Sequence, residues 1–430
     1  MLTPEENELL CRVGPDTPMG KMMRRYWIPA LKSEDLEAGG DPKRVRLLGE
    51  DLVAFRDDDG RIGLLDELCP HRRASLALGR NENGALECLY HGWRIDCTGK
   101  ILDTPVEPED STFKDRIRAT AYKTYESGGV VWAYMGPAGL EPPPVDFYFT
   151  QVPQDRVLTV RVLTSSNWAQ GIEGTIDSSH TNLLHRHGVR PSADVTTTMM
   201  EPGIVARRPS NDTRPVMEAQ DTAYGFRYAA IRKPMVDPDT QKYARVSLFI
   251  APIFAMFPPP HGWVWMQAFV PVDDEHTMFY FFQVAEKALT DQERAQRLEA
   301  AEMRPGIDLD AEFRSKRTRE NRWLQDRAAM RRGESHTGLA GVNPEDFAVQ
   351  ESMGPILDRS KEHLGVADTA VIRFRRMMLD AVKRFTENGT TPVGLTAPIP
   401  YAELRAEEQL LPLNASWHAM SAAGSEPLPV

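Results

Sequence analysis

Two pairs of cysteine and histidine residues early in the 430-residue chain have the composition of a metal site. Cys69 and His71 form the first pair, and Cys88 and His91 form the second after sixteen intervening residues. Two thiolates and two imidazoles can bind Zn²⁺, or a [2Fe–2S] cluster in which two Cys hold one iron and two His hold the other. Zinc fingers place Cys beside Cys and His beside His, whereas each pair here is mixed. The mixed order favours the cluster, and a structural zinc site is the alternative.

Two further histidines, His180 and His185, lie five residues apart and follow the acidic residue Asp177. On a regular helix this separation rotates the second side chain by about 140° from the first, so both reach one ion only where the helix is distorted or ends. Two His and one carboxylate form the facial triad of non-haem Fe(II) oxygenases, which leaves coordination positions for O₂. Taken alone, the pair is a weak signal, because a lone His is more often a hydrogen-bonded core or surface residue.

The sequence around both Cys/His pairs resembles the cluster-binding loops of Rieske proteins of the ring-hydroxylating oxygenase type. The resemblance rests on the runs Cys69-Pro70-His71-Arg72 and Cys88-Leu89-Tyr90-His91-Gly92-Trp93, followed by Asp96 and Gly99. It implies that a Rieske [2Fe–2S] cluster is held by four side chains, those of Cys69, His71, Cys88 and His91. The remaining cysteines, Cys11 and Cys97, have no partner at ligand spacing and are interpreted as small buried hydrophobes.

The run from Asp177 to His185 resembles the mononuclear-iron motif of the same oxygenases, which implies that His180 and His185 bind Fe(II). In that family the third ligand is an acidic residue far downstream on a helix. We expect Asp346 to be this ligand, with Asp358 as the alternative.

Three other polar residues near these motifs receive the simpler interpretation. Glu345 and Glu351 flank Asp346 and are interpreted as solvated helix residues. His187, close to the iron histidines, is interpreted as a polar surface residue.

Asp177 lies three residues before His180, and the resemblance implies that its carboxylate links a cluster histidine of a neighbouring subunit, His91, to an iron-ligand histidine. Carboxylates that bond metal-bound imidazoles orient the ring and raise its basicity. A bridge between subunits requires an oligomer, and the resemblance implies a trimer or a stack of two trimers. A plain helix-surface Asp is the alternative.

The elements that must position these residues form two blocks. Short β-rich runs between Gly- and Asp-rich turns over 43–140 predict an all-β Rieske domain, preceded by an arm over 1–42. Three prolines at 142–144 predict a stiff connector. A block of strand-like runs with flanking helical segments over 145–400 predicts an α+β catalytic domain with an antiparallel sheet, followed by a tail over 401–430.

Composition excludes several classes of partner. The chain has 62 acidic and 51 basic residues, a formal net charge of −11, which repels nucleic-acid phosphates. No run approaches the ~18 to 20 apolar residues of a membrane helix. The first residues lack the basic and apolar regions of a secretory signal, so we expect a cytoplasmic location. No G-x-G-x-x-G fingerprint is present, and we therefore expect a separate NADH-dependent reductase with flavin and an iron–sulfur centre.

The substrate is indicated by weaker signals. The segment 17–29 and the flanks of both metal motifs resemble the phthalate dioxygenase group, whose members act on aromatic acids. This resemblance implies that the chain adds O₂ to an aromatic dicarboxylate, phthalate, to give a cis-dihydrodiol. Arginine pairs with carboxylates through two parallel hydrogen bonds, and Arg207 and Arg245 on predicted strands are the candidates. Three arginines are next in order: Arg208, Arg227 and Arg232.

Several alternatives remain open at this point. Within the family they are a Rieske O-demethylating monooxygenase and a dioxygenase of another aromatic acid, since the same iron site supports each reaction. From other classes they are a zinc hydrolase and a Rieske electron carrier. The carrier would need only residues 43 to about 135 and leaves His180 and His185 unexplained.

Overall fold

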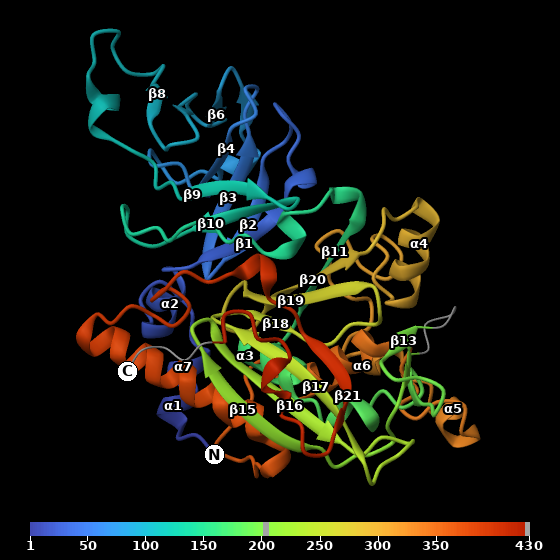
Figure 1. Ribbon diagram of the computed structural model, residues 1–430. Helices are drawn as coiled ribbons and strands as arrows, with labels where there is room; N and C mark the ends of the chain where they lie inside the picture. Colours follow the sequence, from blue (N-terminus) through green and yellow to red (C-terminus); the bar gives the residue numbers. More distant parts are fainter. Residues whose placement is uncertain (201–205, 426–430) are drawn as a thin grey trace. The chain divides into compact units, whose positions relative to one another are not determined.

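The computed structural model describes residues 1–200 and 206–425 of the chain (Figure 1). These residues divide into two compact units. The smaller unit spans Val13–Val145, and the larger unit joins Met1–Arg12 to the chain from Asp146 onward. The prolines at 142–144 lie at the end of the smaller unit.

The smaller unit is built from β-strands, apart from the short helix α2 (Pro18–Met23) and single 3-10 turns. Its described strands form three antiparallel sheets, β2-β3-β4, β5-β6-β7-β8 and β1-β10-β9. Their bounds are β1 Trp27–Lys32, β2 Lys43–Leu47, β3 Glu50–Arg56, β4 Ile62–Asp66, β5 Arg80–Glu82, β6 Ala85–Glu87, β7 Arg94–Ile95, β8 Ile101–Asp103, β9 Lys123–Ser127 and β10 Val130–Tyr134. Every residue of the central strand β10 is buried, as its β-branched and aromatic composition favours. The all-β prediction is confirmed.

The larger unit is organised around an antiparallel sheet of eight described strands, in the order β11-β20-β19-β18-β17-β16-β15, with β21 also paired to β17. These strands are β11 Val157–Thr164, β15 Val216–Thr222, β16 Gly225–Arg232, β17 Gln241–Ile250, β18 Phe254–Met256, β19 Trp263–Pro271, β20 Thr277–Ala285 and β21 Glu407–Pro412. A small three-stranded sheet joins β12 Val189–Pro191, β13 Met199–Met200 and β14 Ala206–Arg208. The last eight residues of β17 are buried, because neighbours cover this strand on both sides.

Helices flank the large sheet, which confirms the predicted α+β class. They are α1 Pro4–Cys11, α3 Trp168–Ile176, α4 Asp291–Ala300, α5 Arg327–Arg332, α6 Val342–Ser352 and α7 Thr369–Asn388. Helix α3 contacts β17, β18 and β19 and also packs against α6 and α7. Within the part of the chain that the structure describes, no helix is both long and apolar enough to cross a lipid bilayer.

Candidate metal centres and ligand cavity

Two loops of the smaller unit carry the Cys/His pairs and have the same backbone hydrogen bonding. The N–H of Cys69 donates to the carbonyl of Ala74, and the N–H of Cys88 donates to the carbonyl of Trp93, both at 2.8 Å. The residue before each acceptor has a left-handed backbone, which Gly92 adopts without strain at φ 72°. Both cysteines are buried in the core of this unit. The two loops therefore present their side chains in matching ways.

The side chains on these loops gather without converging on one point. The rings of His71 and His91 lie 4.5 Å apart between centroids, and Trp93 stacks on His71 at 4.8 Å. Nδ1 of His91 is buried and has no hydrogen-bond partner among the described residues. The four Cys/His ligand atoms do not form a group within 4.8 Å of one another, as a single zinc ion would require. This spread fits the wider [2Fe–2S] cluster.

Ligation of a metal by the buried Cys69 requires loss of its thiol proton. Burial, together with the neighbouring thiol of Cys88, raises the pKa of Cys69 to about 11. Metal ligation requires the thiolate form, and a bound metal supplies the positive charge that stabilises it. The residues present therefore fit the cluster that the resemblance implies.

The second predicted motif lies where a helix stops. Helix α3 begins at the N-cap Asn167 and ends at Asp177, whose backbone is extended. The Asp177 carboxylate accepts the N–H of Ser179 at 2.8 Å, a local turn that competes with continuation of the helix. A single 3-10 turn, His180–Asn182, follows. The break allows two histidines five residues apart to face the same point.

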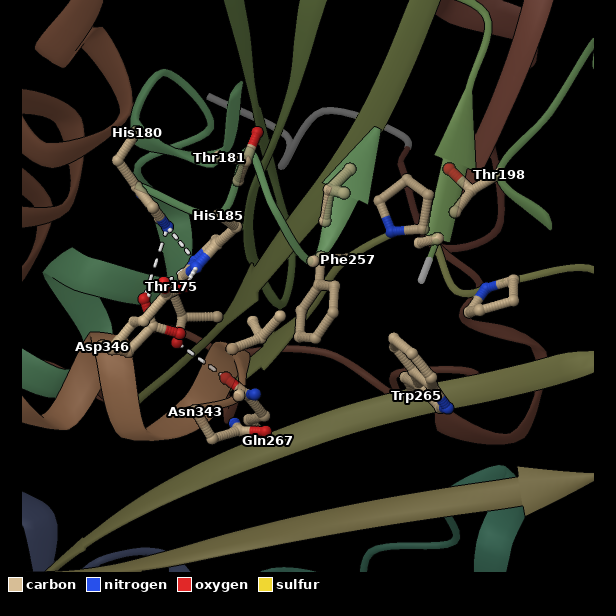
Figure 2. Close-up of a pocket in the computed structure, with 18 of the residues that line it drawn as sticks. Thr175, His180, Thr181, His185, Thr198, Phe257, Trp265, Gln267, Asn343 and Asp346 are labelled. Carbon is tan, nitrogen blue, oxygen red and sulfur yellow. Dashed lines mark hydrogen bonds and ion pairs between the residues drawn. The ribbon is translucent and has the colours of Figure 1, made fainter. Parts of the chain in front are cut away.

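Asp346 of α6 brings a third ligand atom to the point that the two histidines face (Figure 2). Nε2 of His180 lies 3.2 Å from Nε2 of His185, which in turn lies 3.0 Å from Oδ1 of Asp346. The third separation, from Nε2 of His180 to Oδ1 of Asp346, is 3.6 Å. Ligand atoms at about 2.1 Å from one ion and at right angles are about 3.0 Å apart, so the group fits a single metal on one face.

Each histidine of this group has a carboxylate on its other nitrogen. Nδ1 of His180 lies 3.3 Å from Asp177, and Nδ1 of His185 lies 2.7 Å from Glu345. Burial lowers the pKa of His185, but Asp346 and Glu345 together raise it to about 9. Burial raises the pKa of Asp177, and the hydrogen bonds from His180 and Ser179 outweigh this and lower it.

The structure corrects the interpretations of Glu345 and His187. It also places the acidic residues Asp358 and Glu351 in contacts away from the His180/His185/Asp346 group. Glu345 is buried against His185, so its interpretation as a solvated residue is wrong. His187 lines the cavity described below and accepts the N–H of His336 at 3.0 Å, so it is not a plain surface residue. Asp358 is exposed and pairs with Lys361, and Glu351 bonds the indole of Trp323. No sequence signal distinguishes Glu345 from Glu351.

A cavity of about 430 Å³ opens beside the His180/His185/Asp346 group. Its wall combines this polar end with three aromatic rings, Phe257, Trp265 and Phe281, whose centroids lie 5.3 to 6.2 Å apart. Figure 2 shows Phe257 between the metal-ligating side chains and Trp265. An apolar cavity with a few convergent polar groups is the usual form of a small-molecule site.

Three buried arginines lie at this end of the larger unit, and we call Arg208, Arg232 and Arg245 the buried arginine cluster. Arg208 and Arg245 line the cavity. Arg245 forms an ion pair with buried Glu408 and a hydrogen bond to the hydroxyl of Thr198 at 3.1 Å. Arg245 is therefore held in place by protein groups.

The other two members of the cluster lack such a partner. Arg208 donates to the Thr181 hydroxyl at 3.1 Å, and Arg232 donates to the Ser178 carbonyl at 2.5 Å. Neither arginine has a carboxylate partner among the described residues, and each has an Nε with no hydrogen-bond partner there. Burial, together with the charge of Arg245, lowers the pKa of Arg208 to about 9 and that of Arg232 to about 10. Two positive charges at this site are thus uncompensated.

Arg207, one of the two predicted substrate arginines, lies beside Arg208 on β14 but does not line the cavity. Its guanidinium lies 4.0 Å from the exposed Asp194. Successive side chains on a strand point to opposite faces, so of these two neighbours on β14 one faces the cavity and the other faces away from it. Position in the strand therefore favours Arg208. Arg227 bonds the carbonyls of the C-terminal segment instead.

Comparison with known proteins matches both units. The Rieske [2Fe-2S] domain family matches residues 26–125, and the family described as LigXa C-terminal domain like matches residues 133–427. The chain belongs to the Rieske non-haem iron oxygenases. Its enzyme class and its two cofactors, a [2Fe–2S] cluster and a mononuclear iron, are confirmed by this membership.

Individual relatives cover most of this oxygenase. The phthalate 4,5-dioxygenase oxygenase subunit of Pseudomonas putida is 45% identical over 399 residues, which is 92% of this chain and 89% of that protein. The 3-chlorobenzoate-3,4-dioxygenase oxygenase subunit of Comamonas testosteroni is 38% identical and covers 97% of both chains. The terminal oxygenase of carbazole 1,9a-dioxygenase from Nocardioides aromaticivorans has the same fold, with a TM-score of 0.56 at 17% identity over 88% of this chain and 97% of that chain.

Proposed function

We propose that this oxygenase adds O₂ to an aromatic dicarboxylate, phthalate, to give cis-4,5-dihydroxy-4,5-dihydrophthalate. The observation that carries the proposal is the buried arginine cluster, whose members Arg208 and Arg245 line the same cavity as the His180/His185/Asp346 group. Phthalate is the substrate named for a relative that is 45% identical, which supports the same choice.

Net charge favours two carboxylates over one. The cluster contains three buried guanidinium groups, and one buried carboxylate, Glu408, is paired with it. An unpaired buried charge is costly unless a counter-charge approaches it. A dianion offsets the two remaining positive charges, whereas a monocarboxylate such as 3-chlorobenzoate leaves one of them. Arg208 and Arg245 are the two members of the cluster that line the cavity, so we assign them as the groups that bind the carboxylates, with Arg208 in place of Arg207.

The remaining roles follow from the positions of the side chains. Cys69, His71, Cys88 and His91 would hold the [2Fe–2S] cluster, and His180, His185 and Asp346 would hold the iron, which supplies the activation of O₂ when bound. Aromatic rings of the cavity wall would contact the substrate ring and exclude water from it.

The proposal includes two partners. A separate NADH-dependent reductase with flavin and an iron–sulfur centre would deliver electrons, in keeping with the description of the relatives as oxygenase subunits. A neighbouring copy of the chain, in a trimer or a stack of two trimers, would place its His91 against Asp177. Asp177 is 24% exposed, which leaves its carboxylate accessible to a partner.

The test is turnover by the purified, iron-loaded chain with a phthalate-pathway reductase and NADH. We expect O₂ uptake and cis-dihydrodiol formation in equal amounts with phthalate, and much slower turnover of benzoate and 3-chlorobenzoate. A relative 31% identical is a 5,5'-dehydrodivanillate O-demethylase oxygenase subunit, so a methoxylated aromatic acid is included, with formaldehyde as its product. Faster turnover of that acid or of a monocarboxylate would overturn the dicarboxylate assignment.

A further inference from the structure

Glu345 is a buried carboxylate that contacts the candidate iron site without being one of its three converging ligands. Its Oε2 lies 2.7 Å from Nδ1 of His185, and its Oε1 accepts the hydroxyl of Thr337 at 2.5 Å. The side chains of His185 and Glu345 are 3% and 7% exposed. Both oxygens of this carboxylate therefore have a fixed partner in a place that water hardly reaches.

This contact determines how the imidazole of His185 is presented. The ring has two nitrogens, and Nδ1 is occupied by Glu345 while Nε2 is directed at Asp346 and His180. A carboxylate on one ring nitrogen fixes the tautomer and orientation of the ring, and so decides which nitrogen a metal can use.

Helix α6 supplies both carboxylates. Consecutive side chains on an α-helix leave it about 100° apart, so Glu345 and Asp346 can approach opposite nitrogens of one ring. The helix is itself tied to α3, where the Gln170 amide donates to the carbonyl of Gln350 at 3.2 Å. One helix thus sets the position of a ligand and the orientation of a second ligand.

The corresponding contact of His180 is weaker. Asp177 lies 3.3 Å from Nδ1 of His180 and is 24% exposed, against 2.7 Å and 7% for Glu345. His185 is consequently the more rigidly oriented of the two histidines.

We propose that Glu345 is a positioning residue of the iron site, which orients His185 for metal binding, and that Thr337 holds Glu345 in place. The inference rests on the proposed assignment of iron to His180, His185 and Asp346. Because Glu345 acts through His185, its loss weakens metal binding and changes the geometry of the bound ion while the three ligands remain.

The experiment measures metal binding in the full chain with its [2Fe–2S] cluster intact and its mononuclear site emptied by a chelator. Co(II) is titrated into the unmodified protein and into Glu345→Gln, which keeps the shape and removes the charge. We expect about 10- to 100-fold weaker Co(II) binding in the variant, the usual loss when a carboxylate behind a metal-bound histidine is removed. We also expect a shift of the Co(II) visible absorption bands, which report ligand geometry.

Matched variants separate positioning from folding. Glu351→Gln removes another carboxylate of α6, a half-buried one bonded to Trp323 and to the N–H of Ser165, and should leave Co(II) binding unchanged within about twofold. Thr337→Val should weaken binding in the same direction but less than Glu345→Gln, and Thr337→Ser should restore it. If Glu345→Gln does not fold, the comparison of Thr337→Val with Thr337→Ser still tests the positioning role of Glu345.

The outcomes distinguish this inference from the proposed function. Unchanged affinity and unchanged absorption bands in both Glu345→Gln and Thr337→Val would overturn the positioning role and leave the iron site intact. An unmodified chain that binds no Co(II) would remove the iron site itself, and this inference with it.

Discussion

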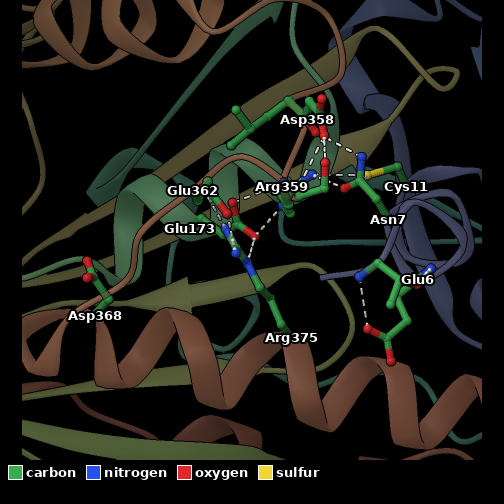
Figure 3. Close-up of polar contacts among 12 residues, drawn as sticks. Glu6, Asn7, Cys11, Glu173, Asp358, Arg359, Glu362, Asp368 and Arg375 are labelled. Atoms are coloured by element: carbon green, nitrogen blue, oxygen red, sulfur yellow. Dashed lines mark hydrogen bonds and ion pairs between the residues drawn. The ribbon is translucent and has the colours of Figure 1, made fainter. Parts of the chain in front are cut away.

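Two groups of buried arginines in the larger unit differ in how their charges are balanced. Arg359 and Arg375 lie on either side of Glu173, with Nε atoms 2.9 and 2.7 Å from its Oε1, and Arg375 also pairs with Glu362 at 2.5 Å (Figure 3). In this network two guanidinium groups meet two carboxylates. The buried arginine cluster at the cavity has three guanidinium groups and one buried carboxylate, Glu408.

The Glu173 network stabilises the fold, whereas the buried arginine cluster is suited to binding a ligand. The charges of the balanced network are paired within the protein, so no ligand is needed to offset them. The network also anchors α3, the helix that ends at Asp177 and leads into His180. The unbalanced cluster is costly in the free protein, and an anionic ligand removes that cost. The same residue type therefore serves stability in one place and recognition in the other, according to the carboxylates that surround it.

The largest expected effect is the loss of Glu173. Glu173→Gln leaves Arg359 buried without a carboxylate partner among the described residues, and breaking a buried ion pair in this way costs about 3 to 5 kcal/mol. Chemical denaturation should show that decrease in the free energy of unfolding. Glu362→Gln is the control, since among the described residues Glu362 pairs with Arg375 alone and is 20% exposed, and its loss should be smaller. Equal losses would contradict the central role of Glu173.

The next effect is on turnover and not on stability. Arg208→Gln should lower kcat/KM for phthalate about 10- to 150-fold, since charge-assisted hydrogen bonds contribute ~1.5 to 3 kcal/mol. The free energy of unfolding should stay the same or rise, because an uncompensated buried charge is removed. Arg207→Gln changes the adjacent residue outside the cavity wall and should leave both quantities unaltered. A loss of kcat/KM in Arg207→Gln alone would reverse the assignment.

A smaller effect is expected on acidification. Burial raises the pKa of Glu173, but Arg359 and Arg375 together hold it below its ordinary value of 4.5. Its contribution to stability is therefore complete above the unfolded-state pKa and is lost as the pH falls through the lower folded-state pKa. Urea denaturation between about pH 6 and about pH 3 should show a steeper loss in the unmodified chain than in Glu173→Gln. Parallel curves would show that Glu173 does not carry this dependence.

The smallest effect concerns the thiol at the edge of the network. Cys11 accepts Nη1 of Arg359 at 3.1 Å and donates to Asn7 at 3.7 Å, and burial raises its pKa to about 11. Cys11→Ser keeps a donor and an acceptor there, so the free energy of unfolding should fall by about 1 kcal/mol or less. A loss as large as that of Glu173→Gln would place the thiol at the centre of the network.

The sequence alone determined the features that depend on neighbouring residues. Mixed Cys/His pairs predicted two metal-binding loops, and alternating patterns with turn residues predicted the all-β unit and the α+β unit. The spacing of His180 and His185 predicted that both reach one ion only where a helix is distorted or ends, and helix α3 ends at Ile176. It ends there because the Asp177 carboxylate accepts the N–H of Ser179 in a local turn.

Only the tertiary structure decided which distant residues meet. Glu345 lies 160 residues from His185 in sequence, and its contact with that ring depends on how α6 packs against α3. The choice between Arg207 and Arg208 depends on which face of β14 turns to the cavity, and a one-residue shift in a strand reverses every side chain. Short-range patterns show periodicity and turns, whereas burial and long-range pairing arise only when the elements pack together.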